Sequence, residues 1–105
     1  MLNKIEYSPK ALQDLDEIWN YIENKLYNPI AAKNTINGIL DKVENLISFP
    51  EAGKKLMFEN KIDSGYRFIS FKNYLVFYRL ESNTIFIDRV IYSGRNYTKI
   101  LFSNS

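Results

Sequence analysis

The fold of this chain is decided by residues 66–102, YRFISFKNYLVFYRLESNTIFIDRVIYSGRNYTKILF. Aromatic and β-branched residues, which favour strands, dominate three runs within it: 66–71, 74–80 and 84–92. Polar residues typical of turns separate the runs at Lys72-Asn73 and at Glu81-Ser82-Asn83. Short polar breaks between strand-like runs indicate hairpins. The stretch therefore predicts a three-stranded antiparallel meander.

An irregularity is predicted in the last strand. Ile87 and Val90 fall on opposite faces of a regular strand, because side chains alternate along it. A bulge near Asp88-Arg89 accounts for this change of phase and would re-aim neighbouring side chains. Beyond the strand, the apolar residues of 97–102 predict a short helical tail.

Two helices are expected to cover this sheet. Ser8-Pro9 and Asn28-Pro29 each place a capping side chain ahead of a proline, a combination typical of helix starts. Apolar residues then recur every three or four positions, as on the buried face of an amphipathic helix. The first helix is predicted over about Pro9–Leu26, and the second ends at Phe49-Pro50. The short break between them predicts an antiparallel hairpin, and Gly38 is expected to mark close packing of the second helix.

The remaining segments complete one domain. Leu2–Tyr7 is predicted to be a first strand that joins the later sheet, and residues 54–65 fit either a short edge strand or an ordered loop. With 105 residues the chain is expected to form a single domain, residues 1–105, that folds without a disulfide or a metal. The expected class is α+β, a helical hairpin packed on a small antiparallel sheet in the order β-αα-βββ.

The composition excludes several kinds of chemistry. The chain contains neither cysteine nor histidine, so a structural zinc site and a Ser-His or Cys-His catalytic pair are excluded. Its glycines form no nucleotide-binding motif, and no cofactor or metal is expected. The sequence has no apolar run of signal-peptide or membrane-spanning length, which predicts a soluble protein of the cytoplasm.

Positive charge lies in the second half. Residues 1–49 carry five basic and seven acidic residues, a balance of −2, whereas residues 50–105 carry nine basic and five acidic residues, a balance of +4. All four arginines lie in this half: Arg67, Arg79, Arg89 and Arg95. Either this half faces an acidic partner, or its charges belong to an ordinary solvated sheet surface.

The candidate functional residues are the arginines with Tyr92 and Tyr97. Guanidinium groups bind phosphate and tyrosine rings stack on bases, so the set suits RNA and a scissile phosphate, and equally an acidic protein. Arg95 and Tyr97 carry most weight, because they follow the last strand in a predicted loop. Lys54, in the loop after the hairpin, either solubilises the chain or contacts an acidic partner.

Other polar residues favour a structural interpretation. Three strand tyrosines are interpreted as core or half-buried: Tyr66, Tyr74 and Tyr78. Arg79 is interpreted as a solvated charge, and Asp14, with the other acidic residues of the two helices, as part of a solvated helix face.

A series of short motifs runs along the chain. They are YSPKALQDL (7–15), NPIAA (28–32), FPEAGK (49–54), YR (66–67), NYLVFYR (73–79), IDRVIY (87–92) and GRNY (94–97). In their order and spacing the chain resembles the RelE/ParE superfamily of bacterial toxins from type II toxin-antitoxin modules. The resemblance implies a β-αα-βββ fold and a small antitoxin, encoded beside the toxin, that neutralises it.

The resemblance also separates branches by target. The branch that cleaves mRNA on ribosomes carries an arginine where this chain has Leu75, and His or basic residues beyond the last strand, whereas this chain has no His. The run 73–79 and the long hairpin are similar to the ParE branch, which is associated with poisoning DNA gyrase by binding. The usual His of that branch at the end of the last strand is Tyr92 here.

Three functions stay open at this level. The first is a ParE-like, plasmid-stabilising toxin that inhibits growth through DNA gyrase, with target-binding residues Arg67, Arg89, Arg95, Tyr97 and Lys54. The second is a ribosome-dependent mRNA endonuclease, whose catalytic residues would be Arg67, Arg89, Tyr92 and Arg95, and the third is a non-toxic binding module. Leu75 and the missing His favour the first. The expected partners are an antitoxin and gyrase, or the ribosome with mRNA, in a dimer or a toxin-antitoxin hetero-oligomer, and no membrane is expected.

Overall fold

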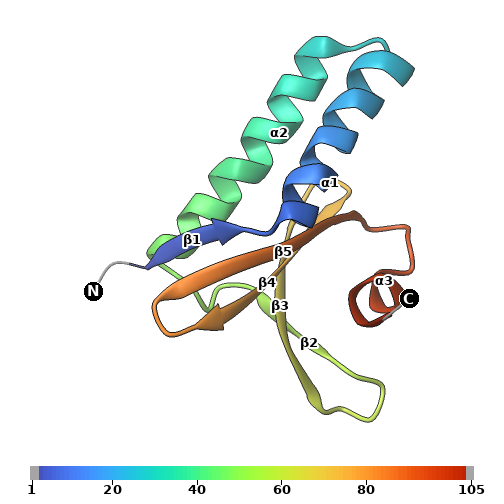
Figure 1. Ribbon diagram of the computed structural model, residues 1–105. Coiled ribbons are helices and arrows are strands. Elements are labelled where there is room, and N and C mark those ends of the chain that lie inside the picture. Colours follow the sequence, from blue (N-terminus) through green and yellow to red (C-terminus); the bar gives the residue numbers. More distant parts are fainter. Residues whose placement is uncertain (1–2, 104–105) are drawn as a thin grey trace.

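The computed structural model describes residues 3–103 as a five-stranded sheet with a helical hairpin on one face (Figure 1). In chain order the elements are β1 (Lys4–Tyr7), α1 (Pro9–Asn20), a π-helical turn (Tyr21–Lys25), α2 (Pro29–Glu44), a 3₁₀ turn (Asn45–Ile47), β2 (Lys54–Met57), β3 (Asp63–Phe71), β4 (Tyr74–Glu81), β5 (Thr84–Tyr92) and α3 (Tyr97–Phe102). The predicted α+β fold is confirmed. Leu2, expected in the first strand, lies outside the described residues.

Both helices of the hairpin begin at their predicted caps. Ser8 Oγ accepts a hydrogen bond from the Ala11 N–H at 2.9 Å, and Asn28 Oδ1 accepts one from the Ala31 N–H at 3.0 Å. The first helix continues to Lys25, but its end is a π-helical turn rather than α-helix. Among residues 3–103 no helix has the length and apolarity needed to cross a membrane.

The sheet is mixed, in the order β1-β5-β4-β3-β2. Strands β2 to β5 pair antiparallel, which confirms the meander and makes residues 54–57 an edge strand. The expected antiparallel sheet gains one parallel pair, because β1 runs parallel to β5 with Ile5 opposite Ile85. A parallel pair needs a long connection, and here the hairpin and most of the meander lie between the two strands.

The predicted bulge in β5 is present at Asp88. Two adjacent residues of β4 pair with Ile87 and Arg89, so Asp88 has no partner of its own in that strand. The extra residue resets the alternation of side chains. Val90 therefore rejoins Ile87 on the face toward the hairpin, where both are buried.

The main core lies between the hairpin and this face of the sheet. Ile39 and Val43 of α2 pack with Val76 and Tyr78 of β4, and all four are fully buried. Gly38 brings α2 close to the sheet, because a Cβ at this position would overlap the ring of Phe71. The close packing expected at this glycine is confirmed.

The opposite face of the sheet is covered by α3, which forms the predicted helical tail (Figure 1). The rings of Tyr97 and Phe77 pack with their centroids 5.3 Å apart. Phe102 packs against Tyr66 at 5.8 Å and against Phe58 at 4.9 Å. The two faces of the sheet thus carry different covers, a long hairpin and a short C-terminal helix.

Candidate functional site

The middle of α1 and the end of β5 border a cleft of about 480 Å³. We call it the α1–β5 cleft, and its polar and aromatic lining residues are Asp14, Glu17, Tyr21, Tyr74, Tyr92 and Arg95. Tyr92 and Arg95 belong to the set predicted from the sequence. The cleft therefore brings together two of the candidate residues, Tyr92 and Arg95.

An ion pair between Asp14 and Arg89 holds this region together. Nε and Nη2 of Arg89 donate to the two carboxylate oxygens of Asp14 at 2.8 and 2.9 Å, and the Val90 N–H donates to the same carboxylate at 2.9 Å. The Asp14 side chain is 8% exposed and that of Arg89 is 19% exposed. The hydrogen bonds with Asp14 raise the pKa of Arg89. Arg89 is thus charged, and its guanidinium is held by the Asp14 carboxylate within the fold.

The start of α1 is attached to the same bulge. Ser8 Oγ donates to the Asp88 carbonyl at 2.7 Å, and the Ser8 N–H donates to the Ile87 carbonyl at 2.9 Å. A bulge leaves backbone groups without partners in the neighbouring strand, and here Ser8 and Asp14 supply partners. The helix therefore sets the position of the end of β5 and of the residues that follow it.

Tyrosine rings form the open side of the cleft. Tyr74 and Tyr92 pack edge to face with their centroids 6.0 Å apart. Tyr92 is 50% exposed and Tyr21 is 54% exposed. Burial raises the pKa of Tyr74, so its hydroxyl is protonated near neutral pH. The cleft offers ring surface and the neutral hydroxyl of Tyr74 to a partner.

Arg95 lies at the rim of the cleft, in the connection between β5 and α3. Its backbone N–H donates to the Tyr92 carbonyl at 3.0 Å, and the Ser93 N–H donates to the Asn73 carbonyl at 2.8 Å, which fixes the connection. The Arg95 side chain is exposed and has no hydrogen bond or ion pair within the described part of the chain. Its guanidinium is available to a partner.

Arg67 and Lys54 lie elsewhere, on β3 and β2. Arg67 Nη1 donates to the carbonyls of Glu51 and Gly53 at 3.1 and 2.9 Å, so it holds the loop after the hairpin. The buried Tyr78 holds the same loop by accepting a hydrogen bond from the Gly53 N–H at 2.9 Å. Lys54 is exposed at the first position of β2.

The predicted residues therefore occupy separate places. Tyr97, expected both in the loop after the last strand and at the start of the helical tail, begins α3 and packs its half-buried ring on Phe77. The predicted set divides into Tyr92 and Arg95 at the α1–β5 cleft, Arg89 beside it, Arg67 and Lys54 near the loop 51–53, and Tyr97 between α3 and the sheet. The structure does not gather all of them into one site.

Arg79, interpreted from the sequence as a solvated charge, is ion-paired on the α3 side of the sheet. Its Nε donates to Asp88 Oδ2 at 2.9 Å and its Nη1 to Glu81 Oε2 at 2.6 Å. The Tyr66 hydroxyl also donates to Asp88 Oδ2, at 2.8 Å. Burial, followed by this hydrogen bond, raises the pKa of Tyr66 to about 12. The interpretation is corrected in part: the Arg79 side chain is 37% exposed but paired, because Asp88 lies on the same face of β5 as Phe86, the cross-strand partner of Arg79.

Asp14, expected on a solvated helix face, is buried instead, with 7% of the residue exposed. Its spacing carried the signal, since Ala11, Asp14, Leu15 and Ile18 follow the i, i+3, i+4, i+7 pattern of one helix face. A carboxylate within an apolar stripe needs a charged or hydrogen-bonding partner. The position of Asp14 within the apolar stripe is therefore the sequence signal for a buried partner.

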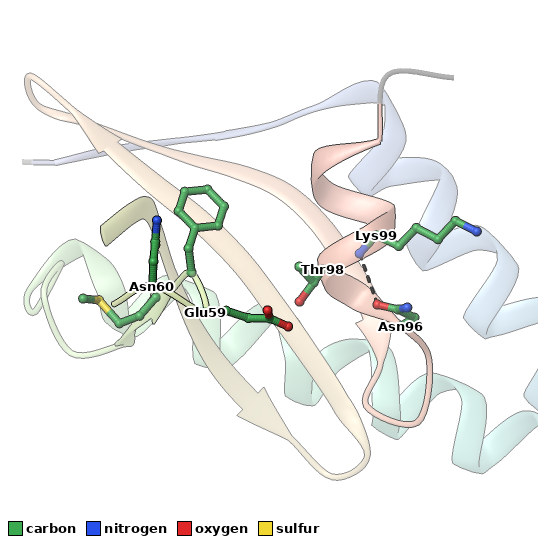
Figure 2. Close-up of a pocket in the computed structure, with 7 residues that line it drawn as sticks. Glu59, Asn60, Asn96, Thr98 and Lys99 are labelled. Atoms are coloured by element: carbon green, nitrogen blue, oxygen red, sulfur yellow. Dashed lines mark hydrogen bonds between the residues drawn. The ribbon is translucent and has the colours of Figure 1, made fainter. Parts of the chain in front are cut away.

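A second hollow lies between the β2–β3 turn and α3, with a volume of about 770 Å³ (Figure 2). It is lined by Met57–Asn60 on one side and by Asn96, Thr98 and Lys99 on the other. Asn96 Oδ1 accepts a hydrogen bond from the Lys99 N–H at 3.2 Å and thereby caps α3. Within residues 3–103 no cluster of three or more acidic side chains is placed to hold a metal ion.

Comparisons with known proteins add a family and a fold. The family described as "ParE toxin of type II toxin-antitoxin system, parDE" matches residues 5–97 of this chain. A solved structure, "Chromosomal ParDE TA system from P. aeruginosa", is similar with a TM-score of 0.72, 22% sequence identity and coverage of 86% of this chain and 95% of that chain. At this identity the likeness concerns the fold. No curated protein matches the sequence significantly.

Proposed function

The chain belongs to the ParE toxin family of type II toxin-antitoxin systems, and on this premise we propose that it inhibits DNA gyrase by binding and that a cognate antitoxin neutralises it. The similarity of the run 73–79 to the ParE branch supports gyrase as the target. Growth inhibition in the bacterial cytoplasm and maintenance of a plasmid carrying the gene follow from this activity.

The engaged arginines support binding rather than RNA cleavage. Arg89 is paired with Asp14, and Arg67 donates to two loop carbonyls. A nuclease needs such donors aimed at the charge that develops on the scissile phosphate, whereas these guanidinium groups point at partners within the fold. Leu75, where the mRNA-cleaving branch has an arginine, is a partly buried apolar residue of β4.

The free guanidinium of Arg95 beside the exposed ring of Tyr92 carries the proposal. Arginine and tyrosine are enriched at the energetic centres of protein interfaces. Both residues are held in place by backbone hydrogen bonds of the connection, and groups that are already ordered lose less entropy on binding. We assign direct contact with gyrase to Arg95 and Tyr92, and a further contact to Lys54. Arg89 and Tyr97 support the site by positioning β5 and α3.

The antitoxin is assigned to the surface of the hairpin. Leu26, Tyr27 and Ile30 at its tip are 55%, 86% and 74% exposed. Apolar side chains gathered on a surface mark an interaction site. An amphipathic antitoxin helix with apolar anchors would cover them.

The target is tested by inducing the chain in a bacterial host and assaying the purified protein. We expect growth to stop, gyrase supercoiling of relaxed plasmid to be blocked, and translation of a reporter mRNA to continue. Cleavage of mRNA only on ribosomes would overturn the gyrase assignment in favour of the endonuclease. Normal growth at confirmed expression of folded protein would indicate a binding module without toxicity.

The site is tested with Arg95→Ala, using Lys33→Ala, an exposed lysine of α2, as the control for loss of a surface charge. We expect Arg95→Ala to raise the half-inhibitory concentration for supercoiling about tenfold, equal to about 1.4 kcal/mol. Lys33→Ala is expected to leave it unchanged. Equal potency of the two variants would place the gyrase contact outside the α1–β5 cleft.

A further inference from the structure

A basic hollow adjoins the α1–β5 cleft, and Arg95 lines both. Its volume is about 430 Å³, and we call it the cation hollow. It is lined by Lys10, Arg95, Asn96, Lys99, Ile100 and Ser103. The charged residues come from separate segments, the first turn of α1, the connection after β5, and α3, and all of them are positive.

None of these three cations is in an ion pair within residues 3–103. The side chains of Lys10, Arg95 and Lys99 are exposed and form no ion pair or hydrogen bond there, and the described lining residues include no carboxylate. The other arginines each meet a carboxylate: Arg67, Arg79 and Arg89. Like charges gathered around one hollow repel each other, so a bound anion would relieve that repulsion.

The packing of α3 places Lys99 on the side of the hollow that faces α1. In Figure 2 its side chain extends away from Asn60 and toward α1, where Lys10 also lines the cation hollow. The cap from Asn96 and the ring contact between Tyr97 and the sheet hold the first turn of α3. The helix turns that carry Lys10 and Lys99 are thus held next to the same hollow, while the two exposed ammonium groups keep the mobility of lysine side chains.

We propose that the cation hollow binds a phosphate group. The fork of an arginine matches two phosphate oxygens, and lysines add compact charges. A terminal phosphate carries nearly two negative charges near neutral pH and three acceptor oxygens, so it can meet Lys10, Arg95 and Lys99 together. A carboxylate offers one charge and two oxygens, which leaves part of the positive charge unmatched.

The surroundings favour a terminal phosphate over the backbone of a long duplex. Duplex binders present an extended basic face, whereas Glu17 lies in the adjoining cleft and the net charge of the chain is only +2. The same cleft presents the rings of Tyr74 and Tyr92, which suit stacking with a base. The phosphate therefore comes either from free phosphate or from the end of a nucleotide chain.

Binding is tested by NMR on the full chain labelled with ¹⁵N, titrated with sodium phosphate and with sodium chloride at equal ionic strength. We expect saturable shifts with phosphate at amides near residues 10 and 95–100. The double variant Lys10→Gln/Lys99→Gln is expected to weaken binding at least about tenfold. The matched control Lys25→Gln/Lys33→Gln removes two exposed lysines of the hairpin and is expected to change it less than about twofold. Thermal unfolding checks that both variants are folded.

Further arms identify the source of the phosphate. Adenosine 5′-monophosphate is compared with adenosine, and a single-stranded oligonucleotide with a 5′-phosphate is compared with the same strand without it. Tighter binding of the phosphorylated strand than of inorganic phosphate assigns the site to a nucleic-acid end, and equal binding assigns it to free phosphate.

Equal shifts with phosphate and chloride, no effect of the double variant, or binding of a hexaglutamate peptide without phosphate binding would overturn the proposal. Since no assay contains gyrase, its outcome is independent of the proposed target.

Discussion

Asp14 of α1 and Arg89 of β5, 75 residues apart in sequence, join helix to sheet through a two-point ion pair at 2.8 and 2.9 Å. Replacing Asp14 by alanine leaves the guanidinium without its counter-charge and the Val90 N–H without its acceptor. Breaking a buried pair in this way costs about 3–5 kcal/mol. Because Arg89 keeps some contact with water, we expect Asp14→Ala to lower the free energy of unfolding by about 3 kcal/mol in urea titrations.

The neighbouring Asp16, exposed on the same helix, provides the control. Asp16→Ala is expected to change the free energy of unfolding by less than about 0.5 kcal/mol. Asp14→Asn keeps an acceptor for the Val90 N–H and should fall between the two. Equal losses for the Asp14 and Asp16 variants would contradict the assigned role of the ion pair.

Gly38 sets the distance between α2 and the sheet. In an open helix, glycine to alanine stabilises by about 1 kcal/mol, but a Cβ here would overlap the ring of Phe71. Overpacking of this kind costs about 1–3 kcal/mol. We expect Gly38→Ala to lower the melting temperature, and Gly38→Ala/Phe71→Leu to recover part of the loss. A higher melting temperature for Gly38→Ala alone would show that the ring moves aside freely.

Tyr66 predicts how the fold responds to alkali. Burial and the contact with Asp88 raise its pKa from 10.0 to about 12. The folded protein therefore holds this proton more tightly than the unfolded chain does, and the corresponding stability is present below pH 10 and lost as the pH rises toward 12. We expect the free energy of unfolding to fall over this window, and to fall less steeply in Tyr66→Phe. The same slope in both proteins would exclude this proton as the cause.

The elements of the fold were predictable because neighbouring residues encode them. The caps at Ser8 and Asn28, the turn at Lys72-Asn73 and the slip of phase near Asp88 all act within a few positions of the chain. The parallel pairing of β1 with β5 has no such local signal, because it joins residues 80 positions apart, as Lys4 and Thr84 are.

The candidate site was less predictable for a related reason. The sequence around Arg67, Arg89 and Arg95 does not show which of them is paired. Their roles depend on the partner that the fold brings to each. A loop carbonyl meets the first and a helix carboxylate meets the second, while the third is left exposed. Lys10 and Lys99, at opposite ends of the chain, share a hollow only because α3 returns to the start of α1.

Comparing Arg67→Ala with Arg95→Ala distinguishes a residue that stabilises the fold from a residue that contacts the target. The Arg67 side chain is 20% exposed and donates to the carbonyls of Glu51 and Gly53, so Arg67→Ala should lower the free energy of unfolding by about 1–2 kcal/mol. Inhibition of supercoiling, corrected for the folded fraction, should stay within about twofold, since the α1–β5 cleft is untouched. Arg95→Ala should show the reverse, unchanged stability with weaker inhibition. If Arg67→Ala is fully stable yet inhibits poorly, its guanidinium contacts gyrase directly, as the sequence alone predicts, and the loop contacts are secondary.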